Sequence, residues 1–297
     1  MKNYIFNYYY DKDFGMLRWC KGTRGEDNPY RKELVSQLDQ IYGYMVWLTP
    51  SLPDNYRKEW EKDLDMLTNI IIKEFYSVKY NFFWGTLTDN KYVYAKDNPG
   101  DPANTLWLIY QIGKLQNNPA FVEFARTNAA HLIDIAYDDS SKCWTRRFDA
   151  QGKIDKNKEW WGLAELDQTT ATLSIADPSY ARYLVTTYSD WFEHLVDHKN
   201  HEIWHMVDEH NKPDLSYPKQ HIWKNAFHSF EHALIGYITT AAIKGETFRL
   251  HYAFMNDADT RYIHPYTYTG KIVKIDKTVV KGNGATTNYT VTFSDLH

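Results

Sequence analysis

Two short segments carry residues whose types and spacing could do chemistry. The first covers residues 159–168 and reads EWWGLAELDQ. Trp161 and Glu165 are four positions apart, so they share one face if the segment is helical. An aromatic plate beside a carboxylate suits a sugar, because ring faces pack on C–H groups while the carboxylate binds hydroxyls. The plainer interpretation is a tryptophan in the core with a glutamate at its rim.

The second segment covers residues 223–234 and reads WKNAFHSFEHAL. Lys224, His228, Glu231 and His232 fall at positions i, i+4, i+7 and i+8, which predicts an ionisable stripe on an otherwise apolar helix. A lone histidine on such a helix is usually a hydrogen-bonded core residue. Four ionisable groups on one stripe each need a partner or water, so the stripe indicates a functional site.

The same stripe fits a His-x-x-Glu-His pattern, which is an alternative from another enzyme class. In zinc metallopeptidases this spacing places two imidazoles and a general base on one helical turn. His228 and His232 would then be zinc ligands and Glu231 the base. The sequence offers no evident third ligand, so we expect neither a metal nor another cofactor.

Both segments lie within a repeat. Trp84, Trp144 and Trp204 are spaced 60 residues apart, and an aspartate follows each after four or five positions. Helical patterns fill the intervals, at residues 28–48, 53–76, 101–115, 119–137, 158–175, 178–196 and 221–242. We predict a unit of helix, helix and short β-hairpin, with the tryptophan on the first strand of each hairpin. A fainter copy is expected at residues 11–19.

Units of this kind bury their apolar faces only against neighbours, which leaves an open solenoid or an α/α toroid. Irregular stretches at residues 91–100 and 211–220 favour the toroid, with loops over a site. We therefore predict an all-α, incomplete toroid over residues 1–245. A β-rich extension over residues 246–297 should pack on it as a small antiparallel sheet, with alternating patterns at 266–275 and 287–293 and a turn at 281–284.

Composition excludes several classes of function. The net charge of -4, without a basic run, argues against nucleic acid or an anionic membrane as a partner. The 24 Tyr, 14 Phe and 11 Trp suit either a large core or a sugar site. Only two cysteines occur, Cys20 and Cys143, and the first residues lack a signal-peptide pattern. A reducing, cytoplasmic location is expected, with a signal upstream of Met1 left open.

The two segments resemble motifs of the N-acylglucosamine 2-epimerase superfamily. Residues 160–165 are similar to its Trp-Trp-x-x-Ala-Glu motif, residues 224–228 to its Lys-x-x-Tyr-His motif, and the Trp–Asp hairpins to its repeated turns. Residues 291–296 resemble a C-terminal extension of one bacterial branch. The resemblance implies an (α/α)6 barrel and metal-free epimerisation or isomerisation of a small sugar, either an aldose or an N-acyl hexosamine.

The resemblance assigns His228 as the general base. It would remove the proton α to the carbonyl of an open-chain sugar and give an enediolate, for which an imidazole pKa of ~6.5 is suitable. Glu165 would bind sugar hydroxyls or steady the imidazole. The expected substrate-binding residues are Trp160, Trp161, Lys224, Trp204, Glu231 and His232.

Two departures from the family pattern bear on activity. Asp101 stands where the family places its other histidine, and it either acts as an acid or caps a helix, which we favour. Asn104 occupies the second polar position there.

Six hairpins would need ~360 residues, whereas the helical part holds about four. The chain is a truncated product, an open arc or a ring completed by a partner, with a homodimer left open. We expect isomerisation rather than epimerisation, with sugar binding without turnover as the alternative.

Overall fold

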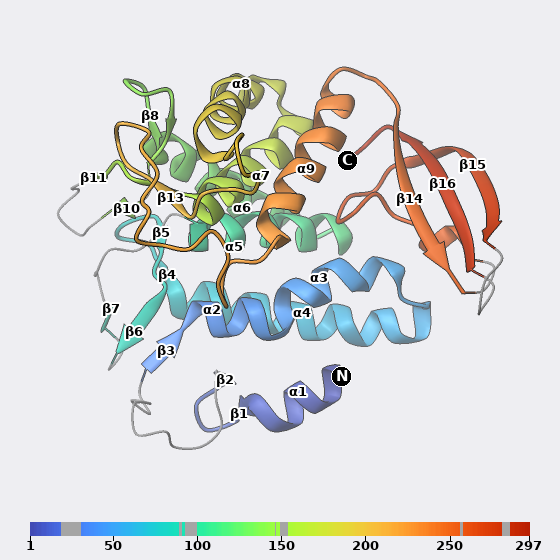
Figure 1. Ribbon diagram of the computed structural model, residues 1–297. Coiled ribbons are helices and arrows are strands. Elements are labelled where there is room, and N and C mark those ends of the chain that lie inside the picture. The colour runs from blue at the N-terminus through green and yellow to red at the C-terminus, as the bar shows by residue number, and fades with distance from the viewer. Residues whose placement is uncertain are drawn as a thin grey trace.

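The helices form an arc with an inner and an outer layer (Figure 1). The computed structural model describes residues 1–18, 31–88, 91–92, 100–145, 147–148, 154–255, 258–280 and 286–297. The inner layer comprises α2 Leu34–Gln37, η1 Leu38–Tyr42 and α3 Gly43–Leu48, which run on as one helical stretch, then α5 Gly100–Leu115, α7 Trp160–Ala176 and α9 Phe227–Ile243. The outer layer comprises α1 Lys2–Tyr9, α4 Asp54–Phe75, α6 Pro119–Ala136, and α8 Ala181–Asp190 with its π-helical extension η4 Trp191–Leu195. Short helical turns lie at η2 Thr49–Ser51, η3 Pro178–Tyr180 and η5 Thr260–Tyr262.

The inner helices are buried because their sequences are apolar or small and polar on every side. In α7 all residues from Gly162 to Ser174 are buried. The hydroxyl groups of Thr169 and Thr170 donate to carbonyls one turn earlier, at 2.9 and 2.7 Å, so these polar side chains need no water. As a result α7 packs against α5 on one side and α9 on the other. The outer helices instead bury a single stripe, as α4 does with Leu64, Leu67, Thr68, Ile71 and Phe75.

Helix starts follow local sequence signals. Asn118 caps α6, since its side chain accepts hydrogen bonds from the backbone N–H groups of Ala120 and Phe121, and Pro119 takes the first position, where its missing N–H is harmless. Asp177 caps η3 in the same way, ahead of Pro178. None of the helices in the described ranges combines the length and the hydropathy that crossing a bilayer requires.

A short hairpin follows each outer helix, which confirms the predicted repeat. The hairpins are β1 Tyr10–Asp11 with β2 Met16–Leu17, β4 Tyr76–Ser77 with β5 Phe82–Phe83, β8 Tyr137–Asp138 with β9 Cys143–Trp144, and a bridge between Val196 and Ile203. Each turn holds a left-handed residue at the same place: Gly15, Asn81, Lys142 and His201, with φ of 76°, 50°, 56° and 64°. The fourth turn has a second one, Glu202, with φ of 79°. The first hairpin is the fainter copy expected near the N-terminus, although Trp19 lies outside the described residues.

The even spacing of the three tryptophans does not reflect equivalent places. Each hairpin is closed by a backbone N–H that donates to the carbonyl of a residue near the end of the preceding helix. The donors are Trp84, Thr145 and Trp204, with N–O distances of 3.0, 2.8 and 2.8 Å. Thr145, and not Trp144, is therefore the counterpart of the other two. The prediction that each tryptophan lies on the first strand of its hairpin is wrong, because Trp144 lies on the second strand and Trp84 and Trp204 come directly after the second strand.

Further short strands lie with the hairpins at one end of the helical body, on the left of Figure 1. They are β3 Arg31–Glu33, β6 Thr86–Thr88 and β7 Lys91–Tyr92 in one sheet, β10 Arg147–Phe148 with β11 Ile154–Asp155, and β12 Lys158–Glu159 with β13 Met206–Val207. The last pair ties the start of α7 to the loop before α9. Residues 211–220 form an irregular stretch there, as expected, whereas most of the stretch predicted at 91–100 lies outside the described residues.

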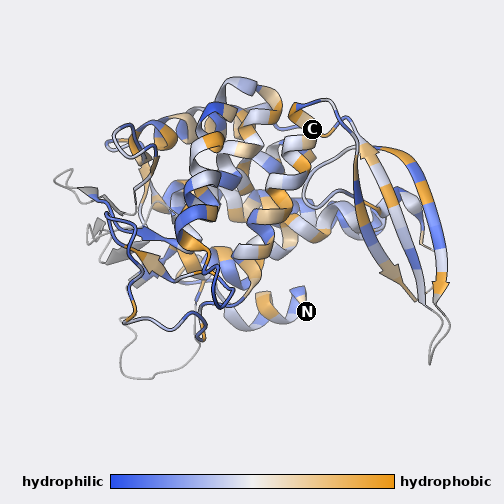
Figure 2. Cartoon of the chain, turned by 45° about the horizontal axis from the view of Figure 1, so that its top comes forward, coloured by the Kyte–Doolittle hydropathy of each residue, from blue (hydrophilic) through white to orange (hydrophobic). Residues whose placement is uncertain are grey.

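The C-terminal sheet lies at the opposite end (Figure 1). Its antiparallel strands are β14 Phe248–Phe254, β15 Lys271–Val280 and β16 Thr286–Ser294, in the order β14-β16-β15. Hydropathy alternates along them (Figure 2), and one face of β16 is buried. That face shares a core with inner helices, since Phe248 and Val291 join a cluster with Ala171 of α7 and Ile235 of α9. The antiparallel sheet was predicted, and the division at residue 245 stays a prediction.

The pattern at residues 266–275 is only partly a strand. β15 begins at Lys271, and residues 263–269 leave the sheet and turn toward the helices. The two ends of the arc also meet nearby, because the rings of Trp47 on α3 and Phe227 on α9 are 5.3 Å apart. The described residues supply four inner helices and no closed barrel.

Candidate active site

Glu165 on α7 is held by donors from α5. Its Oε2 atom accepts hydrogen bonds from Asn104 Nδ2 at 2.9 Å and from Trp107 Nε1 at 2.8 Å. The side chain is only 1% exposed, so these donors replace the water that a buried carboxylate would otherwise need. Its other oxygen, Oε1, is directed toward α9.

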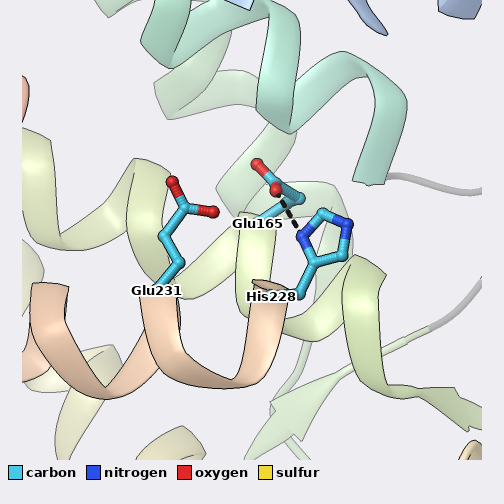
Figure 3. A group of neighbouring side chains, drawn as sticks. All are labelled: Glu165, His228 and Glu231. Carbon is cyan, nitrogen blue, oxygen red and sulfur yellow. Dashed lines mark ion pairs between the residues drawn. The ribbon is translucent and has the colours of Figure 1, made fainter. Parts of the chain in front are cut away.

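His228, the second residue of α9, faces this free oxygen (Figure 3). Its Nδ1 atom lies 3.0 Å from Glu165 Oε1, and its side chain is 25% exposed. Burial lowers the pKa of His228, but the close contact with Glu165 and the charges of Glu165, Glu231 and Asp39 outweigh it, so the pKa is raised above its ordinary value. With Nδ1 turned to Glu165, Nε2 is the ring nitrogen left for a substrate.

Glu231, one turn further along α9, points into the same space (Figure 3). Its Oε1 atom accepts hydrogen bonds from Gln168 Nε2 at 3.3 Å and from the hydroxyl group of Tyr266. Burial and the negative charge of Glu165 raise the pKa of Glu231 to about 7, although the hydrogen bonds and His228 act in the other direction. A carboxyl group that exchanges its proton near neutral pH is typical of an active site.

Asp39 on η1 is a further titratable group here, and the sequence reasoning missed it. Its side chain is exposed to solvent, yet protein surrounds it on most sides. This burial raises the pKa of Asp39 to about 6, with the charge of His228 opposing and that of Glu165 adding to the shift. A side chain that is open to solvent and yet surrounded by protein is expected on the inner side of a ring of helices. The signal was available, because Asp39 lies off the apolar stripe formed by Leu34, Leu38 and Ile41.

His232 is not part of this group. Its Nε2 atom lies 2.7 Å from Asp167 Oδ2, both side chains are 1% exposed, and the ring stacks on Tyr188 at 4.2 Å. A substrate cannot reach a side chain so enclosed, which corrects the expectation that His232 binds substrate. The zinc-peptidase alternative also loses its second histidine ligand, because His232 is directed away from His228 and Glu231.

Glu165, His228 and Glu231 each offer a potential ligand atom within 4.8 Å of the other two, which is the size of a cation site. Glu165 Oε2 and Glu231 Oε1 already accept hydrogen bonds, so the second oxygen of each carboxyl group is the one left for a ligand. The same free oxygens, together with His228, can also exchange protons with a substrate.

The three tryptophans predicted to bind substrate lie in different surroundings. Trp161 is half-buried, and its ring centre lies 6.2 Å from that of His228, so it flanks the imidazole. Trp160 is 3% exposed and packs in the core, with its ring centre 6.3 Å from that of His228. Trp204 contacts Lys219, whose Nζ atom lies 4.2 Å from its ring centre, and it is not part of the group around His228.

Lys224 precedes α9 and does not share its face, so the four-residue stripe is wrong at this position. The side chain is fully buried, and its ammonium group donates to the carbonyl of Ile203 at 2.8 Å and lies 3.6 Å from Glu202. Burial lowers the pKa of Lys224. Lys224 thus fastens the loop before α9 and does not contact a sugar.

Two further histidines gather near Trp160 and were not singled out in the sequence. His205 Nδ1 lies 3.1 Å from His221 Nε2, and His205 Nε2 lies 3.3 Å from Glu159 Oε1. The His205 ring also stacks on Tyr217 at 4.2 Å. His205, Tyr217 and His221 lie in the irregular stretch before α9, where no helical or strand spacing relates them, and Glu159 comes from β12.

A family model for N-acylglucosamine 2-epimerase (GlcNAc 2-epimerase) matches residues 54–229, which is more than half of the chain. The chain belongs to this family. The matched range includes Glu165 and His228, and it ends just before Glu231. The family is one of carbohydrate epimerases and isomerases. Among curated protein sequences there is no significant match.

Solved structures of such enzymes share the fold. A D-mannose isomerase superposes with a TM-score of 0.64 at 13% identity, covering 79% of this chain and 63% of that one. A sugar epimerase from a ruminal bacterium gives 0.65 at 17% identity, with 80% and 63% covered. The cellobiose 2-epimerase from Spirochaeta thermophila gives 0.64 at 18% identity, with 79% and 59% covered. The chain thus spans less than two thirds of each structure.

Asp101 is where this member of the epimerase family departs from the motif. It lies within the first turn of α5, which begins at Gly100, and it does not belong to the group formed by Glu165, His228 and Glu231. The role of Asp101 as a helix cap stays a prediction, because the residues before Gly100 lie outside the described ranges. Gly100 itself is required, since a Cβ atom there would lie 2.4 Å from the Trp161 ring.

An apolar groove of about 470 Å³ lies between α8 and α9. Its lining includes Leu184, Val185, Phe192 and Tyr237, with Lys244 as its charged residue. It contains none of the proton-transfer groups described above, so we do not assign it to the catalytic site.

Proposed function

We propose that this chain is a sugar isomerase that acts on an open-chain aldose or N-acyl hexosamine through an enediolate, with His228 as the general base. The observation that supports this role most strongly is the pairing of His228 Nδ1 with Glu165 Oε1 at 3.0 Å. A carboxylate on Nδ1 keeps a proton there and leaves the lone pair of Nε2 for the substrate. Of the two roles expected for Glu165, steadying the imidazole is therefore the one we propose.

The reaction begins at the C2 proton of the sugar, which is acidic because it lies α to the carbonyl group. Removal by His228 gives the enediolate, and return of the proton to C1 gives the ketose. One base on one face of the sugar suffices for this isomerisation. Epimerisation requires a proton on the opposite face of C2, and the family's second histidine is Asp101 here, so we expect epimerisation to be weak or absent.

The half-buried Trp161 beside His228 supports a sugar as the substrate, since its ring offers a flat apolar face next to the base. The superposed structures, a D-mannose isomerase, a sugar epimerase and a cellobiose 2-epimerase, point in the same direction.

The test is incubation of the protein with a panel of aldoses in deuterated water, followed by NMR of the label at C1 and C2. Ketose formation with deuterium at C1 is the expected result. Rapid inversion at C2 would show that an epimerase reaction prevails and that a second base serves the other face. Sugar binding without any exchange would identify a binding protein without turnover and overturn the proposal.

A further inference from the structure

Residues 263–269 leave the C-terminal sheet and lie against the inner helices. The hydroxyl groups of Tyr268 and Thr172, the latter on α7, are 2.8 Å apart. His264 Nε2 lies 3.0 Å from the carbonyl oxygen of Pro50, at the end of the helical stretch 34–48. These contacts fix the segment on two sides of the arc, while the hydroxyl group of Tyr252 on β14 donates to the carbonyl oxygen of His264 at 2.7 Å and keeps the segment tied to the sheet.

Tyr266 touches both ends of the arc. Its ring centre lies 6.2 Å from that of Trp47 on α3, and its hydroxyl group donates to Glu231 Oε1 on α9. Its backbone has a φ of 65°, a left-handed conformation that costs an aromatic residue of the order of 1–3 kcal/mol. Strain of this kind persists where surrounding contacts determine the conformation, and it concentrates at functional sites.

The contacts of Tyr266 and Gln168 both fall on Oε1 of Glu231. Across the described part of the chain, no hydrogen bond engages the other oxygen, Oε2. A carboxyl group held by one oxygen and open at the other, within 4.8 Å of His228, is arranged to exchange a proton with a substrate bound at the imidazole.

We propose that this segment is a working part of the active site, in which Tyr266 is a positioning residue for Glu231 and Glu231 carries protons between the two sugar oxygens during isomerisation. The inference rests on the proposed function and assigns it a second proton-transfer group. It also assigns the C-terminal extension a role in catalysis beyond packing on the helices.

The proton balance of the reaction requires such a group. His228 takes the C2 proton, while the protonated Glu231 gives its proton to O1 and the enediol forms. The Glu231 carboxylate then takes the proton from the O2 hydroxyl group, the carbonyl forms at C2, and His228 returns its proton to C1. Each group ends in its starting state, and no oxidant or reductant is needed.

The charges around Glu231 keep this proton available near neutral pH. Glu165 on α7 faces it with a negative charge, His228 on α9 with a positive one, and the buried Tyr268 lies close by. Asp39 on η1 faces His228 and Glu165 from the other side. The Tyr266 hydroxyl group stabilises the ionised form of Glu231, so its removal raises the pKa of Glu231 further.

The experiment compares Tyr266→Phe with Tyr268→Phe, a matched control that removes a buried hydroxyl group from the same segment without touching Glu231. We expect Tyr266→Phe to lower kcat for isomerisation about tenfold and to move the alkaline limb of the pH profile upward, with KM little changed. Glu231→Gln should lower kcat about 100-fold, in the range of a lost general acid. Tyr268→Phe should change neither kcat nor the limb. Equal behaviour of the two tyrosine variants would overturn the inference.

A second readout does not depend on turnover. The charge of Glu231 raises the pKa of His228, so NMR titration of the His228 ring should show a lower pKa in both Tyr266→Phe and Glu231→Gln. If the wild-type chain is active but neither substitution changes the pKa of His228, this inference is overturned and the proposed function stands. A wild-type chain that exchanges no sugar proton would overturn the proposed function together with the role of Glu231.

Discussion

Two histidine–carboxylate pairs join α7 to α9, and they differ in exposure. His228 meets Glu165 at 3.0 Å with a quarter of its side chain exposed. His232, one turn later, meets Asp167 at 2.7 Å with 1% of each side chain exposed. The chemistry of the two pairs is the same, and only the open pair can meet a substrate.

The sealed pair, His232 with Asp167, is enclosed by the outer layer of the arc. Asp167 also accepts hydrogen bonds from Trp144 Nε1 at 2.8 Å and Thr187 Oγ1 at 2.5 Å, while His232 stacks on Tyr188. These further contacts, together with that of Trp191 on η4 with the His232 ring at 4.1 Å, join the inner helices to α8, η4 and the hairpin at Trp144. The comparison shows that one ionisable stripe can serve two purposes. On the inner side of the arc it serves catalysis, and on the other side it holds the inner and outer helices together.

The largest expected effect is that of His228→Ala on turnover. Removal of the general base should lower the isomerisation rate ~10²–10⁴-fold. The free energy of unfolding should change by about 1 kcal/mol or less, because the side chain is partly exposed. Deuterium exchange and denaturant unfolding measure the two quantities. The control is His232→Ala, which should destabilise the fold far more. Loss of turnover in His232→Ala without loss of stability would reverse the two roles.

The next effect concerns the sealed pair. Asp167→Ala leaves His232, the Trp144 N–H and the Thr187 hydroxyl group without their shared acceptor, so the free energy of unfolding should fall by ~3–5 kcal/mol. Urea unfolding followed by tryptophan fluorescence measures the loss. The matched control is Asp65→Ala, at a carboxylate on the outer helix α4 that is exposed. A loss below about 1 kcal/mol would show that the pair is not a structural joint.

A smaller effect is expected when the carboxylate of the open pair is changed and its histidine, His228, is kept. Glu165→Gln removes the carboxylate charge next to Nδ1 that raises the pKa of His228, so this pKa falls. His228 acts as a base only when it is neutral, and the acid limb of the pH profile should therefore move to lower pH. We expect kcat to fall ~10–100-fold, as for other residues that orient a catalytic group.

The comparison with Glu159→Gln keeps this test specific, since that substitution removes the carboxylate beside His205 instead. It should leave the acid limb in place. An unmoved limb in Glu165→Gln, measured by the pH dependence of ketose formation, would show that Glu165 does not control the ionisation of His228.

The sequence predicted what depends on periodicity. Helices, the repeated unit and the helical placement of Glu165 and His228 follow from local patterns, because an amphipathic or buried helix must repeat its apolar positions. The family resemblance also allowed for their pairing, with Glu165 either binding sugar hydroxyls or steadying the imidazole. Trp144 was misplaced because a spacing of sixty residues was taken as a register, whereas the backbone hydrogen bonds set the register one position away.

Tertiary contacts decided the rest. Nothing local distinguishes His228 from His232, because exposure depends on which side the outer helices cover. Tyr266 read as part of a strand, since alternation continues through residues 266–275, and only its contacts with Trp47 and Glu231 take it out of the sheet. Lys224 followed the helical spacing, but α9 begins three residues later because Lys224 is drawn to the carbonyl group of Ile203.

The smallest expected effect is that of Asp101→Asn, which tests the residue at the family's second histidine position. Asp101 lies in the first turn of α5, where its negative charge interacts favourably with the helix dipole by ~0.3–1 kcal/mol. Loss of that charge should lower the free energy of unfolding by this amount. The rates of exchange at C1 and C2 should stay within about twofold, because an ordinary aspartate with a pKa near ~3.9 is too acidic to return a proton to an enediolate efficiently. NMR in deuterated water and urea unfolding measure both quantities. A selective loss of C2 inversion in Asp101→Asn would show that Asp101 is a second acid. Proton transfer on the inner surface would then not depend on the open pair of His228 and Glu165 alone.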